Sequence, residues 1–254
     1  MSFGKPFQYK AIIPCAKFKA MENLPIYVSL LFIATTLITI FLFWKATHMS
    51  KTALIIIGCW IAIQAIISLT GFYKISDTMP PRFILLILPP VFLIVALFIS
   101  SNGKKFIDNL DIRWLTLLHS IRIPVELVLF ALFIHKFVPG IMTFEGRNMD
   151  ILSGITAPFV YYFGFVKNKL NNRILIAWNI LCILLLINIV VIAVLSAPFS
   201  FQRFGFNQPN VALLYFPFVW LPCCVVPIVL FSHLAALRLL FQKQSSLYHT
   251  GSLA

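Results

Sequence analysis

The stretch His119-Ser-Ile-Arg122-Ile-Pro124-Val-Glu126 places three ionisable side chains and a proline inside an apolar run that covers residues 114–138. A run of that length can cross a bilayer as a helix. At about 100° per residue, positions 119, 122 and 126 project from one face of this helix. A charged side chain at the centre of a membrane helix costs about 2.5–3.5 kcal/mol and usually marks function. We therefore expect the rest of the chain to form a bundle that shelters this face from lipid.

The composition places the whole chain in the membrane class. Of its 254 residues, 61% are hydrophobic and 11% are charged, and the mean hydropathy is +0.97. A soluble domain carries about 25% charged residues. Lys and Arg outnumber Asp and Glu by 20 to 7, but the basic residues lie in short segments between apolar runs, where they set topology and contact lipid headgroups. This distribution excludes nucleic acid as a partner, and we expect the lipid bilayer to be the main partner of the chain.

Seven apolar segments are each long enough to span a membrane, and they divide the chain into three regions. Residues 1–24 form a basic N-terminal interfacial segment or extension, with Met21 as an alternative start. Residues 25–238 form the seven-helix transmembrane domain, and residues 239–254 form a cytoplasmic polar tail. The predicted helices cover residues 25–45, 53–73, 82–101, 114–138, 149–167, 173–196 and 210–238.

Prolines interrupt several of these segments. Each proline removes a backbone donor and can kink its helix, which membrane proteins tolerate where neighbouring groups satisfy the freed carbonyl. The prolines inside the predicted helices are Pro89, Pro90, Pro124, Pro158, Pro217, Pro222 and Pro227. Residues 106–114 are short and amphipathic, which predicts a segment along the inner interface. The fold class is therefore an all-α membrane bundle of seven transmembrane helices with several proline kinks.

The basic residues also predict the orientation of the bundle. More of them follow the first, third, fifth and seventh segments, namely Lys45, Lys51, Lys104, Lys105, Arg113, Lys167, Lys169, Arg173, Arg238 and Lys243. Fewer follow the other segments, where Asp77, Glu145 and Asp150 also lie. The positive-inside rule then predicts an outside N-terminus and a cytoplasmic C-terminus in the cytoplasmic membrane of a bacterium. The lysines of residues 1–24 oppose this orientation unless Met21 is the start.

The position of each polar residue within its segment gives its depth in the membrane, since each residue rises about 1.5 Å along a helix. Residues of different helices can therefore be grouped by depth. An inner layer comprises His119, Arg122, Asn179, Ser232 and His233. A midplane layer comprises Glu126, Gln64 and Asn188. We predict that His119, Arg122, Glu126, Asn179, His233, Gln64 and Asn188 form a ligand-binding site. Whether their helices are neighbours cannot be read from the sequence.

Two interpretations of the central face stay open. In the structural one, Arg122 and Glu126 are four residues apart and pair directly, so that an internal ion pair holds helices together. In the functional one, Arg122 binds an anionic group, Glu126 carries a proton or pairs with a cation, and His119 relays protons near the cytoplasm. Arg147 and Asp150 lie at the outer end of the fifth segment. They predict a solvated helix start, with a gate as the alternative.

A metal site is a further alternative, although no metal or cofactor is predicted in the preferred interpretation. His119 and His233 lie at matching depths and could be axial haem ligands, or they could form a zinc or iron site with Glu126. The five cysteines have no CxxC spacing and predict neither a disulfide framework nor a zinc site. Residues 211–237 contain no lysine, which excludes a retinal Schiff base in the last segment.

Three functions follow from these patterns. The first is a carrier or binder of a small anionic or proton-linked solute. The second is a sensor or an assembly subunit, whose polar face contacts a membrane-protein partner and passes no solute. The third is an intramembrane haem- or metal-dependent enzyme that uses His119 and His233. The distribution of ionisable groups in depth along one helix favours the carrier.

Overall fold

A computed structural model describes residues 24–75 and 80–251 of the chain. All regular elements in these residues are helices, and no strand occurs among them. Apart from Leu24, the predicted N-terminal segment lies outside the described residues. The alternative start at Met21 lies outside them as well, as do the last three residues of the polar tail.

The helices follow one another with few long connections. In chain order they are α2 (Ile26–Ala46), α3 (Lys51–Leu69), α4 (Ile84–Ile99), α5 (Ser101–Asp108), α6 (Ile112–Leu118), α7 (Arg122–Ile134), α8 (Ile151–Tyr161), α9 (Asn172–Leu195) and α10 (Val226–Gly251). The 3₁₀ turn η3 (His119–Ile121) joins α6 to α7. The π turns η5 (Tyr162–Val166) and η7 (Leu221–Val225) extend α8 and precede α10.

Within the described ranges, five helical stretches are long and apolar enough to cross a membrane: α2, α3, α6 through α7, α9, and η7 through α10. A sixth results if α4 and α5 count as one span, although the chain bends by 90° between them. The stretch Ile151–Val166, which contains α8, is apolar but shorter. The all-helical fold is thus confirmed, with five to six helices able to span a membrane, and the count of seven stays a prediction.

The last predicted helix, 210–238, begins too early. Residues 210–220 form a loop with the 3₁₀ turn η6 (Ala212–Leu214), and helical structure starts at Leu221. Nearly all of these loop residues are buried, so they are apolar because protein covers them. Pro222 is the second residue of η7, a position where the missing N–H removes no helical hydrogen bond.

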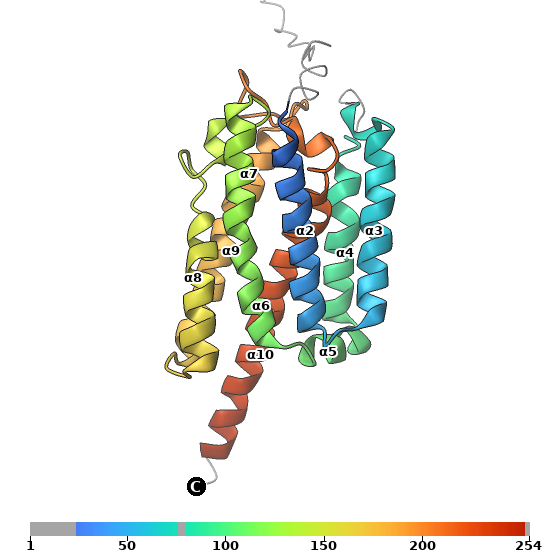
Figure 1. The fold of residues 1–254 in the computed structure, drawn as a ribbon. Coiled ribbons are helices and arrows are strands. Elements are labelled where there is room, and N and C mark those ends of the chain that lie inside the picture. Colours follow the sequence, from blue (N-terminus) through green and yellow to red (C-terminus); the bar gives the residue numbers. More distant parts are fainter. Residues whose placement is uncertain (1–23, 76–79, 252–254) are drawn as a thin grey trace, which may run out of the picture.

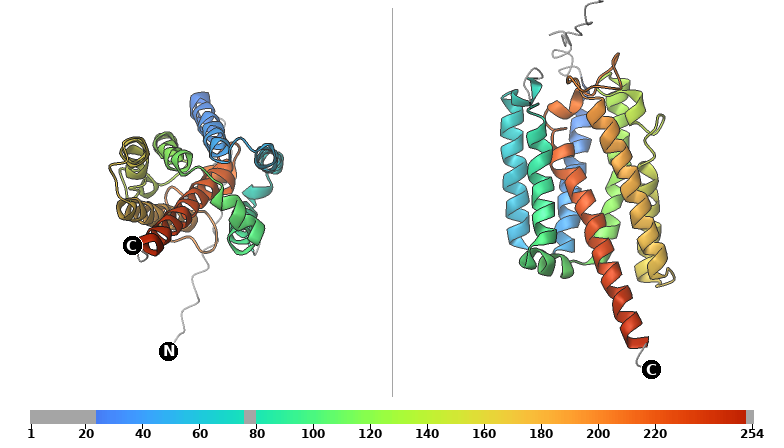
Figure 2. Two further views of the ribbon diagram at one scale, coloured as in Figure 1. Left: turned by 90° about the horizontal axis from the view of Figure 1, so that it is seen from below. Right: turned by 180° about the vertical axis from the view of Figure 1, so that it is seen from behind.

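α10 is the central helix of the bundle. Seen from below in Figure 2, it runs diagonally between α4 and α5 on one side and α6, α8 and α9 on the other. It packs against α9, α6, α4 and α5. Of its apolar stretch 61% is buried, against 11% for α3 at the edge of the bundle. The polar side chains Ser232 and His233, in the middle of α10, are therefore enclosed by protein rather than by lipid.

Polar caps start the helices at the lower end of Figure 1. Side-chain oxygens of Ser50, Ser100, Asp111 and Asn171 accept backbone N–H groups of the first turns of α3, α5, α6 and α9. Such caps satisfy donors that a helix start leaves without a partner. The backbone N–H of Asp111 also donates to the carbonyl of Ala46 (2.9 Å), which ties the start of α6 to the end of α2.

The connection between α7 and α8 enters the bundle instead of staying at its upper end. It contains the 3₁₀ turn η4 (Gly140–Met142), and it descends until α8 begins about half-way down (Figure 1). The loop is tightly folded, because a Cβ at Gly146 would lie 2.4 Å from the carbonyl oxygen of Gly140. As a result, residues 148–150 lie at the depth of the bundle centre.

α5 crosses the lower end of the bundle, in the region where residues 106–114 predicted an interfacial segment (Figure 1). The structure places this helix slightly earlier and ends it at Asp108. Arg238 donates to both carboxylate oxygens of Asp108 (2.7 and 2.9 Å), and Gln242 donates to one of them (3.1 Å). The hydrogen bonds from Arg238 hold the pKa of the Asp108 carboxyl below its usual value. α5 is thereby attached to α10.

The bend between α4 and α5 generates a stability prediction. A Cβ at Gly103 would lie 2.2 Å from the carbonyl oxygen of Leu97, whereas a Cβ at Gly58 would meet nothing within 4 Å. Gly103→Ala should therefore lower the free energy of unfolding in detergent by about 1–3 kcal/mol, as overpacking does. Gly58→Ala is the matched control and should cause no loss. Equal thermal unfolding of the two variants would contradict the close approach.

Candidate functional site

The central site is built on an interruption in the span from α6 to α7. Pro124 has no N–H to donate to the carbonyl of residue 120, so the regular helical ladder cannot continue through this point. The 3₁₀ turn His119–Ile121 occupies it, and α7 starts at Arg122. His119, Arg122 and Glu126 are all buried, with exposed fractions of 0%, 2% and 1%. The prediction that this face avoids lipid is confirmed.

Arg122 obtains its partners from three other parts of the chain. Its Nη1 forms an ion pair with Asp150 and donates to the carbonyl of Cys182 in α9 (3.4 Å). Its Nη2 lies 3.0 Å from Nε2 of His233 in α10. The sequence-based pairing of Arg122 with Glu126 is wrong, because the inserted loop supplies Asp150 as the partner of the guanidinium.

Asn148 connects the loop to Glu126. Its amide nitrogen donates to Oε1 of Glu126 (2.5 Å) and to the carbonyl of Met142 (3.0 Å). Its amide oxygen accepts the backbone N–H of Asp150 (3.0 Å). One fully buried amide therefore fixes Glu126 and Asp150 relative to each other. The sequence analysis missed Asn148, although Asn two residues before Asp at a helix start is a signal for such a turn.

Asp150 and Arg147 lie in different surroundings. Asp150 is only 5% exposed, so the prediction of a solvated helix start is wrong for it. Arg147 is exposed, and its carbonyl accepts a hydrogen bond from the amide of Asn188 (2.9 Å). The structure thus separates the predicted gate into a buried acid inside the network and a basic residue outside it. An acid beside glycine and arginine resembles a surface loop in sequence, which explains the error.

Three residues of the predicted inner layer lie together beside Arg122, and His233 is the one that contacts it. Nδ1 of His233 lies 2.8 Å from the amide oxygen of Asn179. The rings of His119 and His233 are stacked, with centroids 3.6 Å apart and planes 7° apart. Ser232 faces its own helix instead, because its hydroxyl donates to the carbonyl of Ile228 (2.7 Å).

Gln64 and Asn188 lie away from Glu126, contrary to the predicted midplane layer. Gln64 accepts the hydroxyl of Tyr73 (2.5 Å) within the pair α3 and η2 (Phe72–Lys74). α3 lies on the far side of α2 from α7 (Figure 1). Asn188 is exposed and bonded to the loop, as described above. Matching depth does not make two side chains neighbours, because depth says nothing about the order of helices around the bundle.

The alternative metal ligands do not converge. His119 and His233 lie face to face in a stack, an arrangement that leaves no room for a haem iron between their nitrogens. Glu126 is bonded to Asn148 on the other side of Arg122 along α7. In the part of the chain that the structure describes, no group of three His, Cys, Asp or Glu side chains is placed to hold a metal ion. The predicted site of His119, His233 and Glu126 is therefore wrong as a metal centre.

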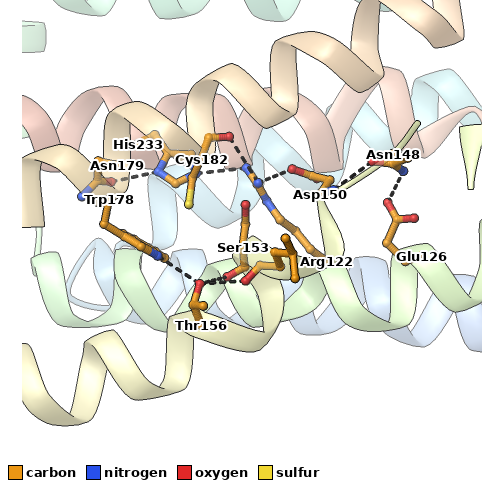
Figure 3. Close-up of polar contacts among 11 residues, drawn as sticks. Arg122, Glu126, Asn148, Asp150, Ser153, Thr156, Trp178, Asn179, Cys182 and His233 are labelled. Carbon is orange, nitrogen blue, oxygen red and sulfur yellow. Dashed lines mark hydrogen bonds and ion pairs between the residues drawn. The ribbon is translucent and has the colours of Figure 1, made fainter. Parts of the chain in front are cut away.

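Figure 3 shows the resulting network as one series of contacts. It runs from Glu126 through Asn148 and Asp150 to Arg122, and then through His233 to Asn179. The series joins two carboxyl groups, a guanidinium and an imidazole inside the bundle. The carboxyl groups and the imidazole can bind or release protons, whereas the guanidinium stays charged. Such series of Asp, Glu and His in membrane helices are typical of proton pathways.

Comparison with known proteins places the network in a family. Residues 80–241 match the model of a family described as "Domain of unknown function (DUF8737)". The chain belongs to this family. The matched residues include the complete network from Glu126 to His233, so the site is part of the region that defines the family. No curated protein and no solved structure matches the chain.

The ion pair of Arg122 and Asp150 generates a second stability prediction. Arg122→Ala leaves a carboxylate buried without its cation, which should lower the free energy of unfolding in detergent by about 3–5 kcal/mol. Arg238→Ala removes the partner of Asp108 at the partly exposed end of the bundle and should lower it by less than about 1 kcal/mol. Thermal or denaturant unfolding of both variants measures the difference. Equal losses would show that the Arg122 pair is not enclosed.

Proposed function

We propose that this chain carries a small solute across the membrane together with a proton that the central network binds. The observation that supports this function is the unbroken series of contacts from Glu126 to Asn179 through Asp150, Arg122 and His233. A series that only held helices together could use amides alone, which are less expensive to bury than charges. Two carboxyl groups at one guanidinium allow one of them to take up a proton while the other balances the arginine.

The contacts favour a proton-linked solute over a tightly bound anion. Arg122 would have to recognise the anion, and its Nη1 and Nη2 already contact Asp150, Cys182 and His233. An anion held through both of these terminal nitrogens would have to displace Asp150, and among the described residues only Nε of Arg122 has no partner in this guanidinium. Glu126 has a free position, because its Oε2 is buried and has no hydrogen-bond partner among the described residues. A proton bound there requires no displacement.

The carrier is also favoured over an assembly subunit. In a subunit of a larger complex, the polar face would be presented to another membrane protein. Here the polar groups come from α7, α9, α10 and the inserted loop, and they bind one another inside one chain. The ion pair and the hydrogen bonds of the network are thus made without a second protein. The outer surface of α3 is apolar, as lipid contact requires.

We also propose seven crossings, an outside N-terminus and a cytoplasmic C-terminus in a bacterial cytoplasmic membrane. The bent pair α4 and α5 then counts as one crossing, and α8 with the loop above it counts as another. The last turn of α2, the helix α5 and the connection from η5 to α9 lie at the end of the bundle at which α10 leaves it (Figure 1). They carry Lys45, Lys104 and Lys169, in support of a cytoplasmic location for that end.

Glu126 provides the direct test of proton binding. Infrared difference spectra of the purified protein between acid and alkaline pH should show a protonated carboxyl band that Glu126→Gln removes. Glu145→Gln is the matched control, because Glu145 is exposed in the loop and its substitution should leave the band. A wild-type protein without a titrating buried carboxyl, or a band that survives in Glu126→Gln, would contradict the proposal.

Transport is tested in the same variants after reconstitution into liposomes. The probes are succinate, glutamate, alanine and phosphate, with an imposed pH gradient as the driving force. In a proton-linked carrier, Glu126→Gln should lose accumulation driven by the gradient while exchange of the same solute continues. Loss of both in a well-folded variant would instead assign Glu126 to solute binding.

The topology is tested with a reporter enzyme that is active only outside the cytoplasm. Inserted after Glu145 it should be active, and inserted after Asn168 or fused to the C-terminus it should be inactive. Both loop positions are exposed, so insertion should be tolerated there. Activity on the same side after Glu145 and Asn168 would show that α8 does not cross, and activity at the C-terminus would reverse the orientation.

A further inference from the structure

The stacked imidazoles of His119 and His233 form a second group within the site, on the opposite side of Arg122 from Glu126 along α6 and α7. Both rings are fully buried. Trp178 of α9 meets both of them edge-on, with centroid distances of 5.7 and 5.8 Å. Residues of η3, α9 and α10 thus meet in one aromatic cluster, and the two histidines in it have very different hydrogen-bond environments.

The contacts of His233 fix where its proton is. The amide nitrogen of Asn179 donates to the carbonyl of Leu175 (2.9 Å), so the amide oxygen of Asn179 faces His233. Nδ1 of His233 must then carry a hydrogen and donate it. Nε2 faces Arg122, whose guanidinium has donors only, so Nε2 must accept. His233 is therefore held as a neutral ring, because a proton on Nε2 would replace an attraction to Arg122 by a repulsion.

His119 has no such hydrogen bonds, although the charge of Arg122 acts on it as well. Both of its ring nitrogens are buried and have no hydrogen-bond partner among the described residues. A buried polar atom without a partner is unfavourable, and a small polar species beside it relieves this. Protonation of His119 breaks no hydrogen bond of the protein. The resulting cation would lie against the neutral His233 ring and beside the indole of Trp178.

The stack also limits the number of protons. Two positive rings with centroids 3.6 Å apart would repel each other strongly at low dielectric. The charged groups that face the stack are Arg122, at Nε2 of His233, and Asp150, which offsets the charge of Arg122. Because His233 is held neutral by Arg122, the single proton of the pair belongs on His119.

We infer that His119 is a proton-binding site on the inner side of Arg122, and that the pair of stacked rings holds one proton at a time. The inference rests on the proposed proton-linked function and deepens it, because it names the group that exchanges the proton on the side opposite Glu126. The ligand is a proton delivered by water. His119 then serves as the inner terminal of the network, and Arg122 separates the two proton sites.

Nitrogen-15 spectra of histidine-labelled protein in detergent micelles test the inference. His119 and His233 are assigned from the signals lost in His119→Phe, which keeps an aromatic ring in the stack, and in His233→Phe. As the pH is lowered, both nitrogens of His119 should shift to the protonated values. His233 should keep a protonated Nδ1 and an unprotonated Nε2 throughout. A titrating His233, or a His119 that stays neutral until the protein unfolds, would overturn the inference.

The fluorescence of Trp178 gives a second readout that needs no folded histidine variant. Protonated imidazole quenches a neighbouring indole, so the wild-type protein should lose emission at the pH at which His119 titrates. Trp178→Phe identifies this component by difference, and the change should be absent in it. Fluorescence that does not change with pH before unfolding would count against the site.

The outcomes separate this inference from the proposed function. A carboxyl band that disappears in Glu126→Gln, together with a His119 that never titrates, would remove the inner proton site and leave the outer one. A titrating His119 without a Glu126 band would remove the proposed proton carrier and leave an isolated imidazole site.

Discussion

The fold depends on the burial of one guanidinium. Arg122 lies in the centre of an apolar bundle and cannot lose its charge, because an arginine side chain stays protonated at every relevant pH. Its position is therefore stable only where other parts of the chain supply acceptors. They come from the loop before α8, from a carbonyl of α9 and from an imidazole of α10. Three separate elements are thus required to meet at the middle of the span that contains Arg122.

This requirement explains two unusual features of the bundle. The connection after α7 descends to mid-depth because Asp150 has to reach Arg122 from the start of α8. α10 runs through the centre, where His233 is enclosed by protein. A carboxyl group and an imidazole at these places would be unfavourable by themselves. Together with Arg122 they form a layer of paired polar groups inside apolar surroundings.

The sequence predicts the membrane class, the approximate helices and the depth of the polar residues, because hydrophobicity and helical rise are local properties. It also brought His119, Arg122, Asn179 and His233 into one layer, and the structure shows contacts among them. Which helices are neighbours is not a local property. Gln64 and Asn188 have the expected depth but other partners, and residues 210–220 are apolar through burial in protein. The sequence around Asn148 and Asp150 indicates a turn, but it does not indicate that this loop descends into the bundle.

At Gly154, α8 approaches α7 closely, and this contact couples the position of α8 to the ion pair of Arg122. Gly154 lies one turn after Asp150, and a Cβ there would stand 3.0 Å from the backbone nitrogen of Ile123 and 3.2 Å from the Cβ of Arg122. The two backbones are therefore in near contact beside the ion pair, without a side chain between them to absorb displacement. Because Asp150 stands directly before the first residue of α8, a slide of α8 along its axis would move the carboxylate relative to the guanidinium. In this chain, the ion pair between Arg122 and Asp150 therefore depends on the position of one short helix along its axis.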